Sequence, residues 1–343
     1  MDVLITGAAG FIGRALVARL RAGAILRDAH GRELQPRTLV LCDTTPAMAN
    51  RAPPDHPVRG PHIEWRSGSV ADQAFVASLI GPETACVFHL AGIVSGAAEA
   101  DFDAGIKANL DGTRNLLEAL KRRAQTGGDG AGPAAVERIR LVQTSSIAVY
   151  GAPVPSRIDD DTQPWPTLSY GAHKLAGELL INDMSRRGLV DGRSVRLSGV
   201  VVRPRQPNGA LSAFNSDLIR EPLAGRPVVS PVSPAATIWI QSIGQTVDNL
   251  LHAMNQDATA FGRQRSVLLP ALACRIDEIV DAIGQVAGAS ASRLVSFQPD
   301  ARIEPMFGRW PVPFTATRAR ELGFGVDSNL LSLIRGYASN PAG

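Results

Sequence analysis

The glycine-rich turn Gly7-Ala8-Ala9-Gly10-Phe11-Ile12-Gly13 decides the fold of this chain. It follows the apolar run Val3 to Ile5, which predicts a buried strand, and precedes Arg14 to Leu20, which predicts a helix. Glycine permits a tight strand-to-helix bend and close approach of a pyrophosphate, and the helix N-terminus offers unpaired N–H groups to the phosphates. An ordinary glycine turn can look the same, but a turn placed after the first strand predicts a dinucleotide site.

Short apolar runs alternate with helical patterns through the first two-thirds of the chain, which is typical of a doubly wound parallel sheet. The stretch Asn109 to Arg122 has leucines at roughly helical spacing. Right-handed crossovers place such helices on both faces of one sheet. We therefore expect an α/β fold with a Rossmann-type parallel sheet, whose later strands are Leu39 to Cys42, Cys86 to Leu90, Ile139 to Gln143 and Ser194 to Leu197.

The alternation weakens after Pro204, where prolines and arginines become frequent. We expect residues 1–200 to form the dinucleotide-binding Rossmann domain. Residues 201–343 are expected to form mainly a smaller C-terminal substrate-binding cap, with some segments returning to the Rossmann domain. Two polar stretches, Arg27 to Arg37 and Gln125 to Pro133, are expected to be surface insertions.

The composition argues against several classes of protein. The 35 basic and 32 acidic residues are interleaved, so no basic tract predicts nucleic-acid binding. No apolar stretch approaches the roughly 18 residues of a membrane span, and the strand-like start leaves no room for a signal peptide. Cys42, Cys86 and Cys274 lack metal-ligand spacing and are expected to be buried thiols in a reducing compartment. We therefore expect a cytoplasmic protein without a bound metal.

Asp43 ends the second predicted strand. A carboxylate there can accept hydrogen bonds from both hydroxyls of an adenosine ribose and would repel the extra phosphate of NADP, so it favours NAD. Its distance from the glycine turn exceeds the usual ~20 residues, and the polar insertion before Arg37 accounts for the excess. A helix cap or a turn residue is the alternative interpretation of Asp43.

Tyr170 and Lys174 are four residues apart and therefore share one face of a predicted helix. A free phenol has a pKa of about 10, too high for a base at neutral pH. A nearby ammonium stabilises the phenolate, so Lys174 is expected to bring the pKa of Tyr170 toward neutrality. Tyr170 would then take a proton from a substrate hydroxyl. The pair occurs often by chance, so it needs support from other motifs.

That support comes from Thr144-Ser145-Ser146, which follows a predicted strand. A hydroxyl there lies at the carboxyl edge of the sheet, where ligands of doubly wound folds bind. With these pieces the chain resembles the extended short-chain dehydrogenases/reductases, the NAD-dependent epimerase/dehydratase family. The resemblance covers roughly residues 1–200, with motifs in the family's order: the glycine turn, His89-Leu90-Ala91-Gly92, Asn109 with Gly112-Thr113, the Ser146 segment and the Tyr170/Lys174 pair.

The resemblance implies a role for each matching residue. Ser146 would hydrogen-bond the substrate oxygen, Tyr170 would be the catalytic acid/base, and Lys174 would also hold the nicotinamide ribose. A homodimer formed through two long helices is also implied. NAD would be the cofactor, bound by Gly7, Gly10, Phe11, Ile12, Gly13, Asp43, Ser69, Val70, Leu90, Ala91, Asn109, Tyr170 and Lys174.

The chain departs from the family at the third strand, where an aspartate often follows the glycine. Here Gly68 is followed by Ser69-Val70, so any adenine contact must come from Ser69 or from the backbone. His89 could be catalytic, but it lies within an apolar run and is interpreted as structural. His173 lies on a different helix face from Tyr170 and is interpreted in the same way.

The segment from Arg203 to Phe214 is unusual for an enzyme acting on sugar nucleotides. Residues 203 to 225 and 309 to 324 resemble the D-erythronate dehydrogenases. This narrower resemblance implies oxidation of the C2 hydroxyl of a small sugar acid such as D-erythronate. Asn208 and Ser212 would join Ser146 and Tyr170 in binding the substrate, and an arginine of this segment would supply the charge.

Two other functions fit the same motifs. An epimerase or dehydratase would act on a nucleotide sugar and recycle tightly bound NAD, without net formation of NADH. A non-catalytic NAD(H)-sensing protein would keep the fold, but it would have no need of Ser146, Tyr170 and Lys174 together.

Overall fold

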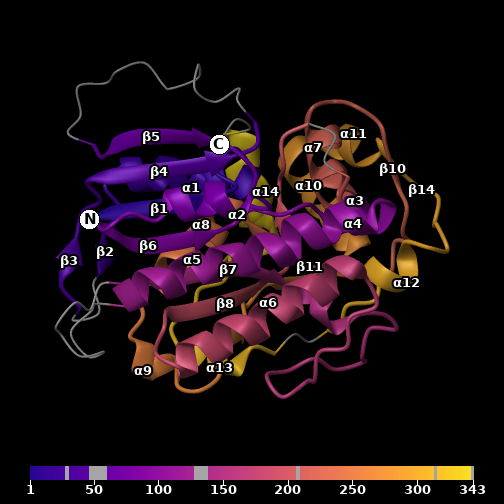
Figure 1. Cartoon of the computed structure of the whole chain (residues 1–343). Helices are drawn as coiled ribbons and strands as arrows, with labels where there is room; N and C mark the ends of the chain where they lie inside the picture. The colour runs from indigo at the N-terminus through magenta and orange to yellow at the C-terminus, as the bar shows by residue number, and fades with distance from the viewer. Residues whose placement is uncertain (28–30, 46–59, 127–137, 206–208, 313–314, 341–343) are drawn as a thin grey trace.

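The computed structural model describes residues 1–27, 31–45, 60–126, 138–205, 209–312 and 315–340. Its centre is a seven-stranded sheet of order β12-β8-β7-β6-β1-β4-β5, and every neighbouring pair in it is parallel. The predicted doubly wound sheet is therefore confirmed (Figure 1). The strands are β1 (Asp2–Thr6), β4 (Thr38–Asp43), β5 (His62–Ser67), β6 (Thr84–His89), β7 (Arg140–Ser146), β8 (Asp191–Leu197) and β12 (Ser266–Leu268).

Helices cover both faces of this sheet because successive strand residues point to opposite sides. Val3 and Ile5 pack in the core with α1 and α8, whereas Leu4 between them packs in the core with α2, α5 and α6. In Figure 1, α5 and α6 lie side by side in front of the sheet. The helices are α1 (Phe11–Arg21), α8 (Ile243–Asn255), α2 (Gln73–Leu79), α5 (Gly112–Thr126) and α6 (Ser169–Arg186).

A second core lies beside the carboxyl edge of the sheet, in the upper right of Figure 1. It contains a three-stranded sheet of β9 (Gly199–Val201), β11 (Thr237–Ser242) and β13 (Leu272–Arg275). A two-stranded sheet pairs β10 (Val228–Ser230) with β14 (Val295–Phe297). The helices of this part are α7 (Phe214–Leu223), α10 (Ile276–Ala287), α11 (Ala289–Ser292), α12 (Glu304–Phe307) and α14 (Leu330–Ser339).

Several segments differ in detail from the sequence prediction. The first insertion forms a small hairpin of β2 (Leu26–Arg27) and β3 (Glu33–Leu34). Most of Gln125 to Pro133 lies outside the described residues. The helix predicted from Asn109 is preceded by α3 (Ser95–Ala100) and α4 (Phe102–Gly105), and a π-helical segment, Ile106–Asp111, leads into it. The remaining short helices are a 3₁₀ turn at Ile147–Tyr150, α9 (Ala258–Phe261) and α13 (Thr317–Glu321). Within the described ranges, no helix is long and apolar enough to cross a membrane.

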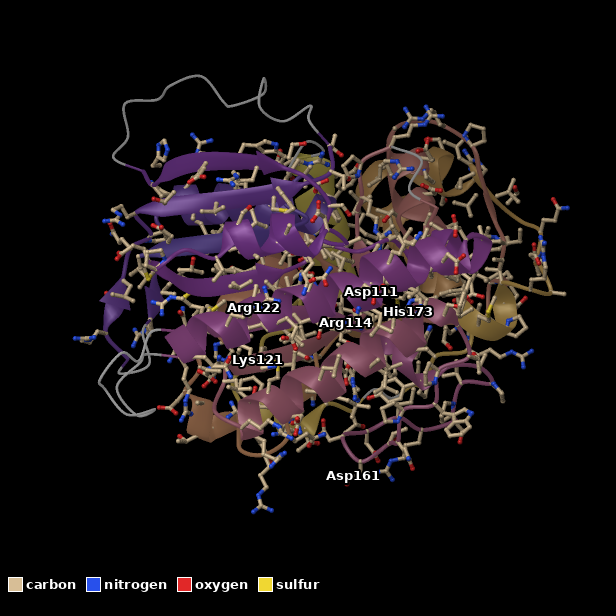
Figure 2. All side chains as sticks on the ribbon, in the orientation of Figure 1. Asp111, Arg114, Lys121, Arg122, Asp161 and His173 are labelled. Atoms are coloured by element: carbon tan, nitrogen blue, oxygen red, sulfur yellow. The ribbon has the colours of Figure 1, made fainter. Side chains whose placement is uncertain are left out.

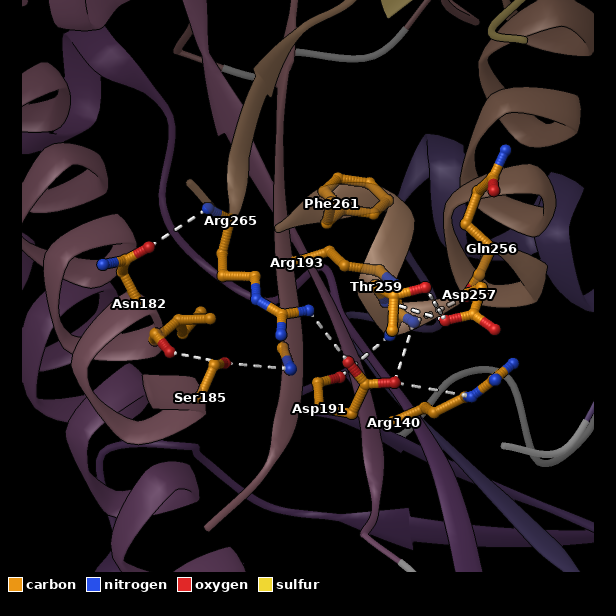
Figure 3. A network of polar contacts seen from close by, with 12 residues as sticks. Arg140, Asn182, Ser185, Asp191, Arg193, Gln256, Asp257, Thr259, Phe261 and Arg265 are labelled. Atoms are coloured by element: carbon orange, nitrogen blue, oxygen red, sulfur yellow. Dashed lines mark hydrogen bonds and ion pairs between the residues drawn. The ribbon is translucent and has the colours of Figure 1, made fainter. Parts of the chain in front are cut away.

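A buried charge cluster holds the amino edge of the sheet together (Figure 3). Asp191, the first residue of β8, accepts a hydrogen bond from Arg193 at 2.8 Å and one from Arg265 at 3.2 Å, and Arg140 lies 3.6 Å away. Two of these arginines also donate hydrogen bonds to backbone carbonyls at the carboxyl end of α8: Arg140 donates to Met254 O and Arg193 donates to Gln256 O. One carboxylate therefore neutralises arginines that join two strands to a helix.

Replacing Asp191 with Asn should lower the free energy of unfolding by about 3–5 kcal/mol, because it leaves buried arginines without a counter-charge. Urea denaturation would measure the loss. Asp183→Asn is the matched control, since its arginine partners are exposed and solvent screens the pair, so the expected loss is much smaller. Equal losses in the two variants would contradict a structural role for the cluster.

Candidate active site

The glycine turn is fixed between the ends of three strands. Gly7 N and Ala8 N donate to Cys42 O at 2.8 and 3.1 Å, and Ala9 N donates to the Asp43 carboxylate at 3.0 Å. Gly7 has a φ of +73°, and a Cβ there would lie 2.7 Å from Ala91 N. A Cβ on Gly13 would lie 2.2 Å from Gly7 O. The turn therefore requires glycine at both positions and presents bare backbone at the start of α1.

A cavity of about 400 Å³ opens beside this turn, at the carboxyl edge of the sheet. Its walls come from the glycine turn, the end of β7, the start of α6 and the second core. Trp310 and Phe307 form part of the apolar wall, and Trp310 stacks on Trp239 at 5.1 Å between ring centroids. The charged side chains among the described lining residues are Arg14, Lys174 and Arg203, so the cavity is cationic.

The predicted catalytic residues meet in this cavity. Ser146 ends β7 and accepts a hydrogen bond from Ala148 N at 3.1 Å, which starts the turn Ile147–Tyr150. Tyr170 is the second residue of α6, and Lys174 lies one helical turn later. The Lys174 ammonium is 5.7 Å from the centroid of the Tyr170 ring. The spacing on one helix face therefore brings the phenol and the amine to the same cavity.

The electrostatics of the site bring in a cation that the sequence did not single out, Arg203. Burial raises the pKa of Tyr170, and the positive charge that opposes this effect belongs to Arg203. Burial also lowers the pKa of Lys174 to about 8, because removing an ammonium from water disfavours its charged form. Arg203 is therefore a second cation, beside Lys174, that acts on the Tyr170 phenol.

The residues predicted to bind the cofactor fall into two groups. Gly7, Gly10, Phe11, Ile12, Gly13 and Leu90 line the cavity together with Tyr170 and Lys174. The other group does not line the cavity: Asp43, Ser69, Val70, Ala91 and Asn109. Asp43 nevertheless accepts a hydrogen bond from the backbone of the glycine turn.

Asn109 supports the site without lining it. Its amide accepts from Ile93 N at 2.9 Å and donates to Ile93 O at 3.1 Å, which fixes the loop that follows β6. Ser69 accepts a hydrogen bond from Ala71 N at 3.2 Å within the turn before α2. The buried Val70 packs on Gly112, where a Cβ would lie 2.6 Å from its side chain. These residues shape the walls around the site.

The two histidines near the site have structural environments. His89 is 1% exposed, and its ring nitrogens lie 2.8 Å from Thr6 Oγ1 and 3.0 Å from Thr113 Oγ1. Burial lowers its pKa to about 3, so it stays neutral at physiological pH. His89 is the last residue of β6 rather than a mid-strand residue. His173 is buried on α6 against Gly105 and does not line the cavity.

A second buried ion pair fixes the end of β7 beside the site. Arg196 of β8 makes a bidentate contact with Glu178 of α6, at 2.7–3.2 Å, and donates to Tyr150 Oη at 3.0 Å. Glu178 also accepts from Ser145 Oγ at 2.5 Å. Because Ser145 precedes Ser146, this network orients the strand end that carries the candidate catalytic hydroxyl.

The substrate end of the cavity contains residues that the sequence did not single out. Ser198 and Asn215 line it, as does Arg203 from the segment expected to supply a cation. Ser212 lines the cavity as expected, whereas Asn208 lies outside the described residues. Within the described parts of the chain, no group of three or more His, Cys, Asp or Glu side chains could hold a metal ion. The strand and helix patterns of the sequence do not point to Ser198 or Asn215 as residues of the site.

Comparison with known proteins agrees with this geometry. The NAD dependent epimerase/dehydratase family matches residues 3–237. A protein of Cupriavidus necator called D-erythronate dehydrogenase is 39% identical over 337 residues, which is 98% of each chain. A protein of the same name from Haemophilus influenzae is 33% identical over 337 residues, again 98% of each chain.

A solved structure points to the same family under a different name. The nucleoside-diphosphate-sugar epimerase from Agrobacterium tumefaciens has a TM-score of 0.86 and 34% identity, and the match covers 99% of this chain and 94% of that one. The names of these relatives and of the solved structure thus disagree on the reaction. The chain belongs to the NAD-dependent epimerase/dehydratase family, and it is an NAD-dependent oxidoreductase.

Proposed function

We propose that this protein oxidises the C2 hydroxyl of a small sugar acid, with D-erythronate as the leading candidate, to the 2-oxo acid. The observation that carries the proposal is the near-full-length similarity to two proteins called D-erythronate dehydrogenase. The cationic cavity at Tyr170 supports it, because an anionic substrate suits such a site.

The residues at the glycine turn fit NAD. The bare backbone at Gly7 and Gly13 leaves room for a pyrophosphate, and the Asp43 carboxylate beside Ala9 suits a ribose with two free hydroxyls. Lys174 would hold the other ribose. When bound, NAD supplies the acceptor for the hydride that leaves the substrate carbon.

The chain's own groups would handle the proton and the orientation of the substrate. Ser146 would donate a hydrogen bond to the C2 oxygen and hold it toward Tyr170. The Tyr170 phenolate would accept the hydroxyl proton as the carbon becomes a carbonyl. Arg203 favours that phenolate against the effect of burial. Trp310 and Phe307 would exclude water from the reacting centre.

The alternative is a nucleotide-sugar epimerase or dehydratase that recycles its NAD. The name of the similar Agrobacterium structure favours it. Net formation of NADH separates the two, because only a dehydrogenase releases reduced cofactor. Asn208 remains a predicted residue of the sugar-acid site.

The proposal extends to assembly, location and domain roles. Leu179 and Leu180 are exposed on α6, and Figure 2 shows Arg114, Lys121 and Arg122 along the neighbouring α5, with Asp111 just before it. We propose that these two exposed leucines, among the charged residues of two adjacent long helices, form part of a homodimer interface. Light scattering would then give about twice the mass of the chain.

We further propose a cytoplasmic location, with residues 1–200 binding NAD and most of residues 201–343 forming the substrate cap.

Tyr170→Phe removes the proposed acid/base hydroxyl and keeps the ring. Turnover should fall by ~100-fold or more, while NADH affinity measured by fluorescence should barely change. In the wild type, sugar-acid oxidation should rise with pH on the alkaline side, because burial raises the pKa of Tyr170 and the phenolate is the active form. Near-normal turnover in the Phe variant would remove Tyr170 from the mechanism.

Asp43→Ala removes the carboxylate that would meet the adenosine ribose. NAD should bind more weakly, and the preference for NAD over NADP should shrink, since the repulsion of a ribose phosphate is lost. Titration calorimetry with both cofactors would measure the change. A wild type that binds NADP more tightly than NAD would show that Asp43 has another role.

The substrate prediction is tested by offering D-erythronate, its stereoisomers, and UDP- and dTDP-sugars to the purified protein with NAD. Absorbance of NADH should rise with a sugar acid and should not require a nucleotide. No NADH with any acid, together with an epimerised nucleotide sugar, would reject the dehydrogenase and establish the alternative.

A further inference from the structure

Arg203 is held rigidly at the cavity wall, two residues after β9. Its backbone N–H donates to Ser216 Oγ at 3.1 Å, and its carbonyl accepts from Arg220 at 2.6 Å. Its own Nε donates to Val200 O at 3.3 Å. Arg203 and Tyr170 line the same cavity, and the positive charge of Arg203 lowers the pKa of the Tyr170 phenol against the effect of burial. A positioned cation therefore shares the cavity with the group that would take the substrate proton.

Two buried polar atoms on the same wall have no protein partner. Ser198 is 9% exposed and Asn215 is 6% exposed, and both line the cavity. Ser198 Oγ and Asn215 Oδ1 make no hydrogen bond to any described residue. A buried polar atom left unpaired costs about 1–3 kcal/mol, so native proteins seldom keep one without a ligand or water. Both atoms are therefore suited to receive hydroxyl groups.

These two atoms belong to one side of the site. A Cβ on Gly199 would lie 2.7 Å from Asn215 Nδ2, so the Asn215 amide rests on the backbone next to Ser198. Gly199 thus lets the first turn of α7 approach the end of β8. The Ser198 hydroxyl and the Asn215 amide therefore reach the cavity from neighbouring positions, one between β8 and β9 and the other in the first turn of α7.

The chemistry of a 2-hydroxy acid matches this arrangement. Its carboxylate carbon is bonded directly to C2, so the cation that binds the carboxylate must lie next to the base that deprotonates the C2 hydroxyl. Arg203 meets this condition. The other cations of the described lining are Arg14, on the helix that follows the glycine turn, and Lys174, which the proposed function assigns to the ribose. No carboxylate side chain is among the described lining residues to compete for Arg203.

We propose that Arg203 binds the C1 carboxylate of the sugar acid, while Asn215 and Ser198 bind its distal hydroxyls. This assignment rests on the proposed function and adds the residues that select the substrate. Arg203 sets the preference for an acid, because a guanidinium can form two parallel hydrogen bonds to a carboxylate. Asn215 and Ser198 set the preference for a polyhydroxylated chain, because their unpaired atoms reject a substrate without hydroxyls.

The first test compares D-erythronate with D-erythronamide, which has the same hydroxyls but no charge. In Arg203→Met, kcat/KM for the acid should fall at least ~30-fold, mostly through KM, and the acid-to-amide ratio should approach one. The ratio isolates carboxylate binding, because any effect of Arg203 on Tyr170 acts on both substrates. Arg203→Lys should restore part of the ratio.

Arg205→Met is the matched control for charge. Arg205 is two residues away, 70% exposed and 3.9 Å from Glu221, so its removal should leave the acid-to-amide ratio unchanged. NADH binding and the melting temperature should confirm that each variant is folded. If Arg203→Met does not fold, Arg203→Lys serves as the test in its place. An ammonium cannot form the two parallel hydrogen bonds to the carboxylate, so the acid-to-amide ratio should still fall below that of the wild type.

The second test compares D-erythronate with 2-hydroxybutanoate, which lacks the distal hydroxyls. Asn215→Leu should reduce the preference for D-erythronate by ~10-fold or more, and should leave NADH binding intact.

The outcomes separate the two levels of the proposal. Unchanged ratios in the Arg203 and Asn215 variants, with a wild type that oxidises sugar acids, would overturn the subsite and leave the proposed function standing. A wild type inactive on every acid would overturn both.

Discussion

The rest of the site depends on one steric constraint: after the end of β1, backbone segments pack so closely that only glycine fits between them. Gly7 meets the backbone at Ala91, and Gly13 meets Gly7 O, at distances that no side chain allows. This contact brings the start of α1 to the switch point between β1 and β6, where parallel sheets of this topology bind ligands. The hydrogen bond from Ala9 to Asp43 then fixes the carboxylate that we propose for ribose recognition relative to the same turn.

Buried charge fixes the two edges of the sheet in different ways. At the amino edge, Asp191 and its arginines connect strands to the end of α8, away from the cavity. At the carboxyl edge, Arg196 and Glu178 tie β8 to α6 and reach Ser145. A buried ion pair adds little net stability over apolar packing, but it strongly disfavours other arrangements, because any misplacement leaves an unpaired charge. The carboxyl-edge pair thus explains why Ser146 and Tyr170 keep a fixed relation.

The second core supplies one wall of the cavity. Its apolar side chains form a cluster of their own, distinct from those on the two faces of the main sheet. Arg203, Asn215 and Trp310 all come from this part of the chain and line the cavity that Tyr170 also lines. In the proposed function, the parallel sheet and its helices bind the dinucleotide and carry the proton acceptor, while the appended part selects the substrate.

The sequence by itself determined the sheet, the glycine turn and the pair of Tyr170 and Lys174, because these depend on local periodicity and on spacing along a single element. It also identified His89 as a buried structural residue, since an apolar run surrounds it. Only the tertiary structure placed Arg203 in the cavity beside Lys174 and Tyr170. Sequence spacing pointed to Lys174 alone, because the effect of Arg203 on Tyr170 depends on distance through space and on burial. The unpaired atoms of Ser198 and Asn215 could not be predicted from the sequence either. A polar atom is buried without a hydrogen-bond partner only because of how the folded chain packs around it.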